Sequence, residues 1–167
     1  NKTEIKKALI DYRREIEINL FPFTIPLINL LRQSDFDIVL ITGSLDFVAE
    51  IFADIFELNY ANVLSSKLAE QNGNYIKEFI PGTYMDSVDK NKAVLSLSDK
   101  YKLSKSIVVA DAVNDLEMFP LVGKSFLMKD QKTQKSLIKE SKQLGAILVD
   151  KNSDTETILK LLKSNFP

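Results

Sequence analysis

The chain has 167 residues, a formal charge of −1 and nearly equal numbers of acidic and basic side chains. This length allows one ordinary domain with a buried core, and the balanced charge argues against a nucleic-acid partner held by a basic surface. The sequence contains neither Cys nor His. Disulfides, thiolate chemistry and histidine-based catalysis are therefore excluded, and any catalysis must use carboxylates, Lys or hydroxyl groups.

No segment of the sequence predicts secretion or insertion into a membrane. The longest apolar tract, residues 20–31, is interrupted by Pro22, Pro26 and Asn29. It is too short to span a bilayer. Because no signal peptide is recognisable either, we expect a cytoplasmic protein without a membrane partner.

The chain begins with two expected helices. Residues 2–19 carry apolar side chains at helical spacing and predict an amphipathic helix. Thr24 is the expected cap of a second helix that extends to Arg32, with Pro26 tolerated in its first turn.

A strand followed by a hydroxyl-rich turn comes next. Residues 36–41 predict a buried strand, Thr42-Gly43-Ser44 a turn, and residues 45–58 a helix. Such a turn is typical of phosphate binding, because the helix N-terminus offers free N–H groups and the positive end of the helix dipole. A simple N-cap at Ser44 explains the same residues equally well.

The middle of the chain predicts a hairpin and a helix with two lysines near its start. Residues 60–64 predict a short strand, and Asn72-Gly73 predicts a hairpin turn. Residues 89–101 predict a helix that carries Lys90 and Lys92 in its first turn. Because a lysine there opposes the helix dipole, one of the two is expected to contact an anionic group; a solvated lysine is the alternative.

The stretch from Ile107 to Met118 is the most informative in the sequence. Ile107, Val108 and Val109 predict a strand covered on both faces, and Asp111 and Asp115 follow it. Two carboxylates at a strand end form a hard-oxygen site suited to Mg²⁺. The alternative is a solvated turn in which Asn114 or Asp115 caps the next helix.

The remaining elements alternate and define the fold class. Residues 125–128 and 146–149 predict strands, residues 133–144 predict a helix, and the capping box Ser153-Asp154-Thr155-Glu156 opens a helix over residues 155–163. Strands that alternate with helices predict an α/β fold with a doubly wound, mostly parallel sheet and flanking helices.

The order of these motifs resembles the haloacid dehalogenase-like (HAD) superfamily, most closely its phosphoserine-phosphatase-like branch, over about residues 20–149. Residues 38–44 look like the second motif of that family, and residues 109–118 look like the fourth, Gly-Asp-Gly-x-Asn-Asp-x-x-Met. Lys92 looks like the third-motif lysine, with Lys90 as the competitor. Ala110 and Ala112 stand where the family has glycine, and each adds a Cβ near a tight turn.

The resemblance implies a Mg²⁺-dependent phosphomonoesterase that acts on a small phosphorylated metabolite. Its implied catalytic residues are Lys92 and Asp115, and its implied metal ligands are Asp111 and Asp115. Phosphate binding is implied for a further set of residues, namely Thr42, Gly43, Ser44, Lys92 and Asn114.

The first motif of the family, Asp-x-Asp-Gly-Thr/Val after a hydrophobic strand, has no counterpart in these residues. It supplies the nucleophile. Asp35-Phe36-Asp37 has the spacing but precedes its strand, so we reject it. In the family the missing strand lies at the centre of the sheet and precedes a helical cap. Residues 1–19 would then be the tail of that cap and residues 20–167 the α/β core.

Two explanations follow for the missing motif. The start at Asn1 rather than Met favours a natural chain that carries the nucleophile upstream, so that residues 1–167 are inactive by themselves. The alternative is a shortened, non-catalytic module that binds a phosphorylated ligand or a protein partner. The sequence contains no indication of the oligomeric state.

Overall fold

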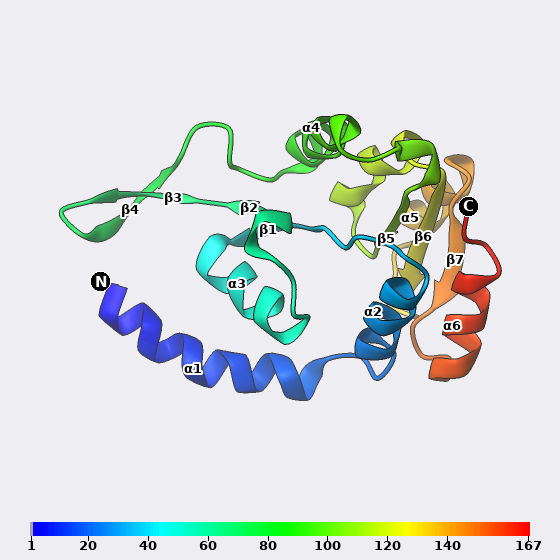
Figure 1. Ribbon diagram of the computed structural model, residues 1–167, viewed down its shortest axis with the longest axis horizontal. Helices are drawn as coiled ribbons and strands as arrows, with labels where there is room; N and C mark the ends of the chain where they lie inside the picture. The colour runs from blue at the N-terminus through cyan, green and yellow to red at the C-terminus, as the bar shows by residue number, and fades with distance from the viewer. Residues whose placement is uncertain (1) are drawn as a thin grey trace. The chain divides into compact units, whose positions relative to one another are not determined.

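The structure is a computed structural model that describes residues 2–167. The chain divides into two compact units, one ending at Met85 and the other running from Asp86 to Pro167. Each unit contains parallel strands with helices beside them (Figure 1). The predicted α/β class with parallel strands and flanking helices is therefore confirmed. Whether residues 1–19 belong to a cap stays a prediction.

The first unit contains a parallel strand pair and an antiparallel hairpin. Its elements are α1 (Lys2–Asn19), α2 (Thr24–Gln33), β1 (Leu40–Leu45), α3 (Asp46–Ile55), η1 (Tyr60–Asn62), β2 (Val63–Ser66), β3 (Leu68–Gln71) and β4 (Asn74–Phe79). Strands β3 and β4 form the hairpin predicted at Asn72-Gly73. Both of these turn residues have positive φ, 51° and 75°, which is the conformation that a tight hairpin turn requires.

Strand β1 differs from its prediction at both ends. Its parallel pairing with β2 begins only at Leu40, opposite Val63, because η1 occupies the chain just before β2. Thr42-Gly43-Ser44 belongs to β1 and is not a separate turn. The register shifts between Thr42 and Leu45, so the hydroxyl-rich segment forms an irregularity in the strand, of the kind that re-aims side chains.

The two expected helix caps of this unit are also corrected. Phe23 is the N-cap of α2, and Thr24 is the first helical residue. Leu45 is the N-cap of α3 and makes no side-chain capping bond, so the simple cap expected at Ser44 is not formed.

The second unit is built on a three-stranded parallel sheet. Its elements are α4 (Ser87–Ser96), η2 (Leu97–Asp99), η3 (Leu103–Lys105), β5 (Ile107–Ala110), η4 (Val113–Leu121), β6 (Lys124–Lys129), α5 (Lys135–Gln143), β7 (Ile147–Asp150) and α6 (Thr155–Lys163). The strand order is β5-β6-β7, and Figure 1 shows the three strands side by side.

Three helix starts in this unit differ from their predictions, those of α4, η4 and α5, and α5 begins at Lys135 rather than at residue 133. Asp86 caps α4, which therefore begins before residue 89. Ala112, rather than Asn114 or Asp115, is the N-cap of η4. Helix α6 has the predicted bounds, but its cap is Asp154, whose carboxylate accepts a hydrogen bond from the N–H of Thr157 at 2.9 Å.

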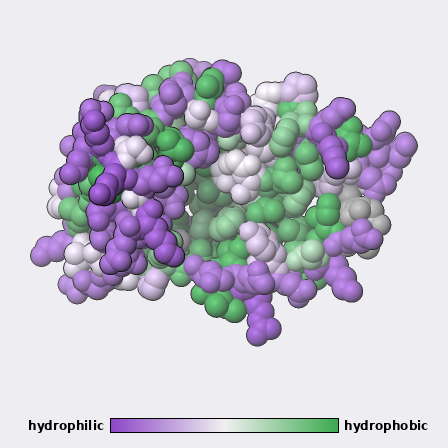
Figure 2. Space-filling view, turned by 180° about the vertical axis from the view of Figure 1, so that it is seen from behind, coloured by the Kyte–Doolittle hydropathy of each residue, from purple (hydrophilic) through white to green (hydrophobic). Residues whose placement is uncertain are grey.

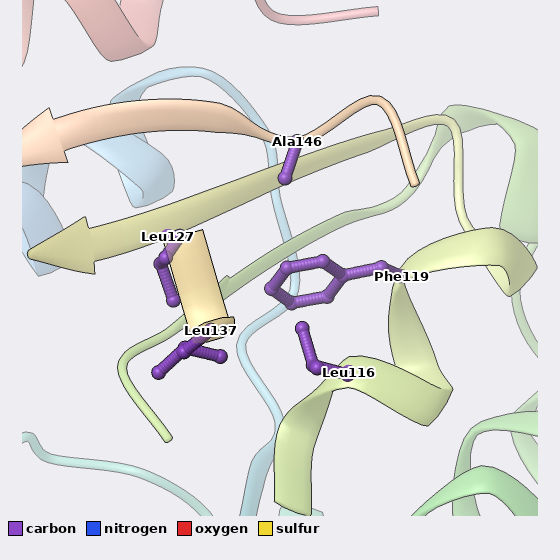
Figure 3. Close-up of a cluster of buried hydrophobic side chains, with 5 residues drawn as sticks. All are labelled: Leu116, Phe119, Leu127, Leu137 and Ala146. Carbon is purple, nitrogen blue, oxygen red and sulfur yellow. The ribbon is translucent and has the colours of Figure 1, made fainter. Parts of the chain in front are cut away.

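An apolar cluster holds η4 against the sheet of the second unit (Figure 3). Leu116 and Phe119 come from η4 and pack with a fully buried Leu127 from β6. Leu137 of α5 and Ala146 complete the cluster, and Val108 and Ala110 of β5 pack against it. The cluster therefore holds the chain just before Asp111, at Ala110, and just after Asp115, at Leu116.

Apolar side chains also reach the surface. Figure 2 shows hydrophobic residues in green among hydrophilic ones. The most exposed large apolar side chains include Ile10, Ile18 and Val113. Within residues 2–167, β1 is paired only with β2 and β5 only with β6, so each has an edge without a strand partner. No helix in this part of the chain has the length and apolar character needed to cross a membrane.

We predict that Phe119→Ala destabilises the protein by about 3–5 kcal/mol, because Phe119 is 2% exposed and its removal leaves a cavity in the cluster. Val113→Ala on the same segment is the control, since Val113 is 63% exposed and its change should stay within about 0.5 kcal/mol. Denaturant unfolding measures both. Equal losses for the two variants would contradict the packing described for the cluster.

Candidate functional site

Asp111 lies directly after β5 and presents an exposed carboxylate. Its side chain is 60% exposed, and its Oδ2 atom lies 3.7 Å from Nζ of Lys151. Ala112 follows with φ −123° and ψ 157°. This is extended backbone that any residue adopts, so the alanine in place of the family's glycine causes no backbone strain there.

Asp115 lies in the first turn of η4 and is buried. Its Oδ1 atom accepts a hydrogen bond from Nζ of Lys90 at 2.5 Å, and its Oδ2 atom accepts one from the N–H of Ala112 at 3.2 Å. The side chains of Lys90 and Asp115 are only 7% and 10% exposed. Both oxygens of Asp115 therefore accept hydrogen bonds from the chain itself, whereas the contact of Asp111 with Lys151 is a longer ion pair at one oxygen.

The structure distinguishes the two candidate lysines of α4. Lys90 is on the buried face of the helix with Ala93 and Val94. Lys92 is 69% exposed at its side chain, and its Nζ lies 3.1 Å from Oδ1 of Asp89. The spacing of Lys90, Ala93 and Val94 is that of one helix face, and this signal in the sequence could have favoured Lys90.

A buried serine braces the irregular end of β1. The carbonyl oxygen of Gly43 accepts a hydrogen bond from the Ser66 hydroxyl at 3.1 Å, and the same hydroxyl accepts one from the N–H of Met85 at 3.1 Å. The hydroxyl of Thr42 accepts a hydrogen bond from the N–H of Ser44 at 3.1 Å. Thr42, Gly43 and Ser44 thus form one ordered segment just before α3. Sequence reasoning missed Ser66, which has no motif around it.

Three further side chains of the second unit bear on the site, and two of them directly follow strands. Asn114 is half-buried in the first turn of η4. Asp130 follows β6 and Lys151 follows β7. Neither Asp130 nor Lys151 was predicted, although a position directly after a parallel strand is the signal that identified Asp111.

A magnesium ion fits one of the two predicted metal ligands better than the other. Mg²⁺ is commonly bound through one or two carboxylates together with waters and substrate oxygens. Asp111 offers an exposed carboxylate, whereas Asp115 already accepts hydrogen bonds at both oxygens. Within the described residues 2–167, no three His, Cys, Asp or Glu side chains are grouped to hold a metal ion. Asp111 therefore fits as a single protein ligand.

Comparison with known proteins identifies the class. The model of the haloacid dehalogenase-like hydrolase family matches residues 4–120, most of the chain. The protein therefore belongs to the haloacid dehalogenase-like hydrolases. The comparison with curated proteins found no match.

Solved structures show the same fold at low identity. They include a probable phosphoserine phosphatase from Vibrio cholerae (TM-score 0.71, 16% identity, covering 92% of this chain and 45% of that one). A phosphoserine phosphohydrolase-like protein from Francisella tularensis has a TM-score of 0.67 at 16% identity, and the match covers 86% of this chain and 62% of that one. A HAD family hydrolase from Salmonella enterica serovar Typhi has a TM-score of 0.66 at 14% identity, and the match covers 83% of this chain and 45% of that one. The chain thus spans about half of the length of these proteins.

We predict that Lys90→Met destabilises the protein by about 3–5 kcal/mol, because it leaves the buried carboxylate of Asp115 without its partner. Lys92→Met is the matched control on the same helix. Its side chain is exposed, so its effect should stay within about 0.5 kcal/mol. Denaturant unfolding at neutral pH separates the two lysines; a larger loss for Lys92→Met would refute the assignment of the buried pair.

Proposed function

We propose that the complete protein is a Mg²⁺-dependent phosphomonoesterase that acts on a small phosphorylated metabolite. Membership of the hydrolase family supports this proposal, as do structural neighbours described as phosphoserine phosphatases. The observation that carries it is the pair of carboxylates after β5, of which Asp115 binds a buried lysine and Asp111 is exposed.

The proposed reaction has two displacements. A carboxylate oxygen of the first aspartate of the family's first motif attacks phosphorus, and the bond from phosphorus to the alcohol oxygen breaks. The second aspartate of that motif gives the leaving alcohol its proton, and takes a proton back from the water of the second displacement. Water then attacks the aspartyl-phosphate, which releases inorganic phosphate and restores the carboxylate. We place this nucleophile outside the 167 residues, in the first motif of the family.

The residues of this chain would bind and neutralise the phosphoryl group. In this proposal the hydroxyl of Thr42 and the backbone of Gly43 and Ser44 bind phosphoryl oxygens, because they precede the N-terminus of α3. Asn114 contributes an amide donor. These roles follow the family resemblance.

We assign the phosphate-binding lysine to Lys90 rather than to Lys92, which the resemblance alone implied. The ammonium group of Lys90 is held by Asp115, while that of Lys92 is exposed beside Asp89. A fixed cation stabilises developing phosphoryl charge without reorganising first. Asp115 then acts by positioning Lys90, and Asp111 is the residue that would hold Mg²⁺. Bound there, the metal would supply Lewis-acid neutralisation of the phosphoryl oxygens.

The alternative is a non-catalytic module that binds a phosphorylated ligand or a protein partner. The observation that favours it is the ammonium of Lys151, which lies 3.7 Å from Oδ2 of Asp111. An internal cation at this distance already offsets the charge that would otherwise attract a metal ion.

We predict that the complete chain hydrolyses p-nitrophenyl phosphate only with Mg²⁺. Asp111→Asn and Thr42→Val should each lower kcat/KM by about 10²-fold or more, since each removes a group that stabilises the phosphoryl transfer. Asp111 is exposed, so its substitution should leave folding intact. Lys92→Gln is the control and should retain the activity.

Two results would distinguish the alternatives. Full activity of Asp111→Asn, with or without Mg²⁺, would refute the enzyme proposal. Binding of inorganic phosphate without any turnover by the complete chain would favour the non-catalytic module.

A further inference from the structure

Lys151 lies between two carboxylates at one edge of the three-stranded sheet. Its Nζ atom is 3.7 Å from Oδ2 of Asp111 and 3.4 Å from Oδ2 of Asp130, and its side chain is only 14% exposed. The three residues directly follow β7, β5 and β6. Because these strands are parallel, their carboxyl ends meet at the same edge. All three residues belong to the second unit.

The two carboxylates that Lys151 contacts are held differently. Oδ1 of Asp130 accepts hydrogen bonds from the N–H of Lys132 at 2.8 Å and from the hydroxyl of Thr133 at 3.2 Å. Desolvation by itself would raise the pKa of Asp130, but these hydrogen bonds and the ammonium of Lys151 together lower it. Asp130 is therefore a fixed, charged anchor. Asp111 is 60% exposed, compared with 25% for Asp130.

We propose that Lys151 is a built-in cation that sets the affinity of Asp111 for a divalent metal ion. This inference rests on the role of Asp111 in the proposed function. The ammonium and a metal ion compete for Oδ2 of Asp111, and like charges a few ångströms apart repel strongly. Asp130 gives the ammonium a second partner, so Lys151 retains one ion pair when a metal ion takes Asp111.

The same edge of the sheet offers a matched control in Lys129. Its Nζ lies 3.1 Å from Oδ2 of Asp150. Lys129 ends β6 just as Lys151 follows β7, and both side chains carry the same charge. Substitution of either lysine changes the net charge equally. Only a local effect at Asp111 therefore separates the two variants.

The test measures metal binding by the complete chain without substrate. Mn²⁺ is titrated, the free ion is followed by electron paramagnetic resonance, and Mg²⁺ is added as a competitor. Lys151→Gln should tighten Mn²⁺ binding about tenfold or more, because a positive charge about 4 Å from the ligand is removed. Lys129→Gln should change the affinity by less than about twofold, since its ammonium is paired with Asp150 rather than with Asp111 and solvent screens the remaining effect.

Asp130→Asn tests the second partner. It should weaken Mn²⁺ binding in the natural background, because Lys151 then loses the carboxylate that draws it away from Asp111. In the Lys151→Gln background the same substitution should have a much smaller effect, and this non-additivity reports the coupling between the two residues.

Several results would overturn the proposal. They are unchanged or weaker binding by Lys151→Gln, equal tightening by Lys129→Gln, binding that survives Asp111→Asn, or no Mn²⁺ binding by any variant. Tighter binding by Lys151→Gln in a protein that never hydrolyses a phosphate ester would support this inference and refute the enzyme proposal. Failure of the enzyme proposal can therefore be distinguished from failure of the proposal about Lys151.

Discussion

The buried ion pair between Lys90 and Asp115 constrains how the second unit can pack. A buried charge without a partner is strongly unfavourable, so the two side chains must be buried together. Their 2.5 Å contact joins α4 to η4. The neighbouring residues of η4, Leu116 and Phe119, pack into the apolar cluster at the sheet. The short segment η4 thus connects a polar contact on one side with the core on the other.

This arrangement leaves the two carboxylates after β5 in different states. Asp115 is buried and fully hydrogen-bonded, and Asp111 is exposed with a lysine nearby. A buried, bonded carboxylate suits the positioning of a cation, whereas an exposed carboxylate suits a metal ion that keeps several waters. The contrast is the physical basis for giving the two residues different roles in the proposed reaction.

Local sequence patterns predicted the elements that are stabilised by local interactions. The hairpin at Asn72-Gly73 and the bounds of α6 follow from turn chemistry and helical spacing, and both are found in the structure. The start of β1 could not be predicted, because it depends on where β2 begins some twenty residues later. The irregularity at Thr42 to Leu45 likewise arises from pairing with a distant strand.

The candidate site was predictable to a similar degree. The position of Asp111 after a buried strand was visible in the sequence, as was a competition between Lys90 and Lys92. Helical spacing could have favoured Lys90 as the buried lysine, but its partner Asp115 lies 25 residues away in the chain. The pairing of Lys151 with Asp111 and Asp130 required the order of three strands, and no local pattern contains that information.

The most direct measurement is a crystal structure of the complete chain with Mg²⁺ and orthovanadate, which mimics the transferred phosphoryl group. We expect a metal ion on Asp111, a vanadate oxygen within hydrogen-bonding distance of Nζ of Lys90, and Asp115 still bound to that lysine. Vanadate bound at Lys92, with no metal ion at Asp111, would contradict the roles assigned to these residues.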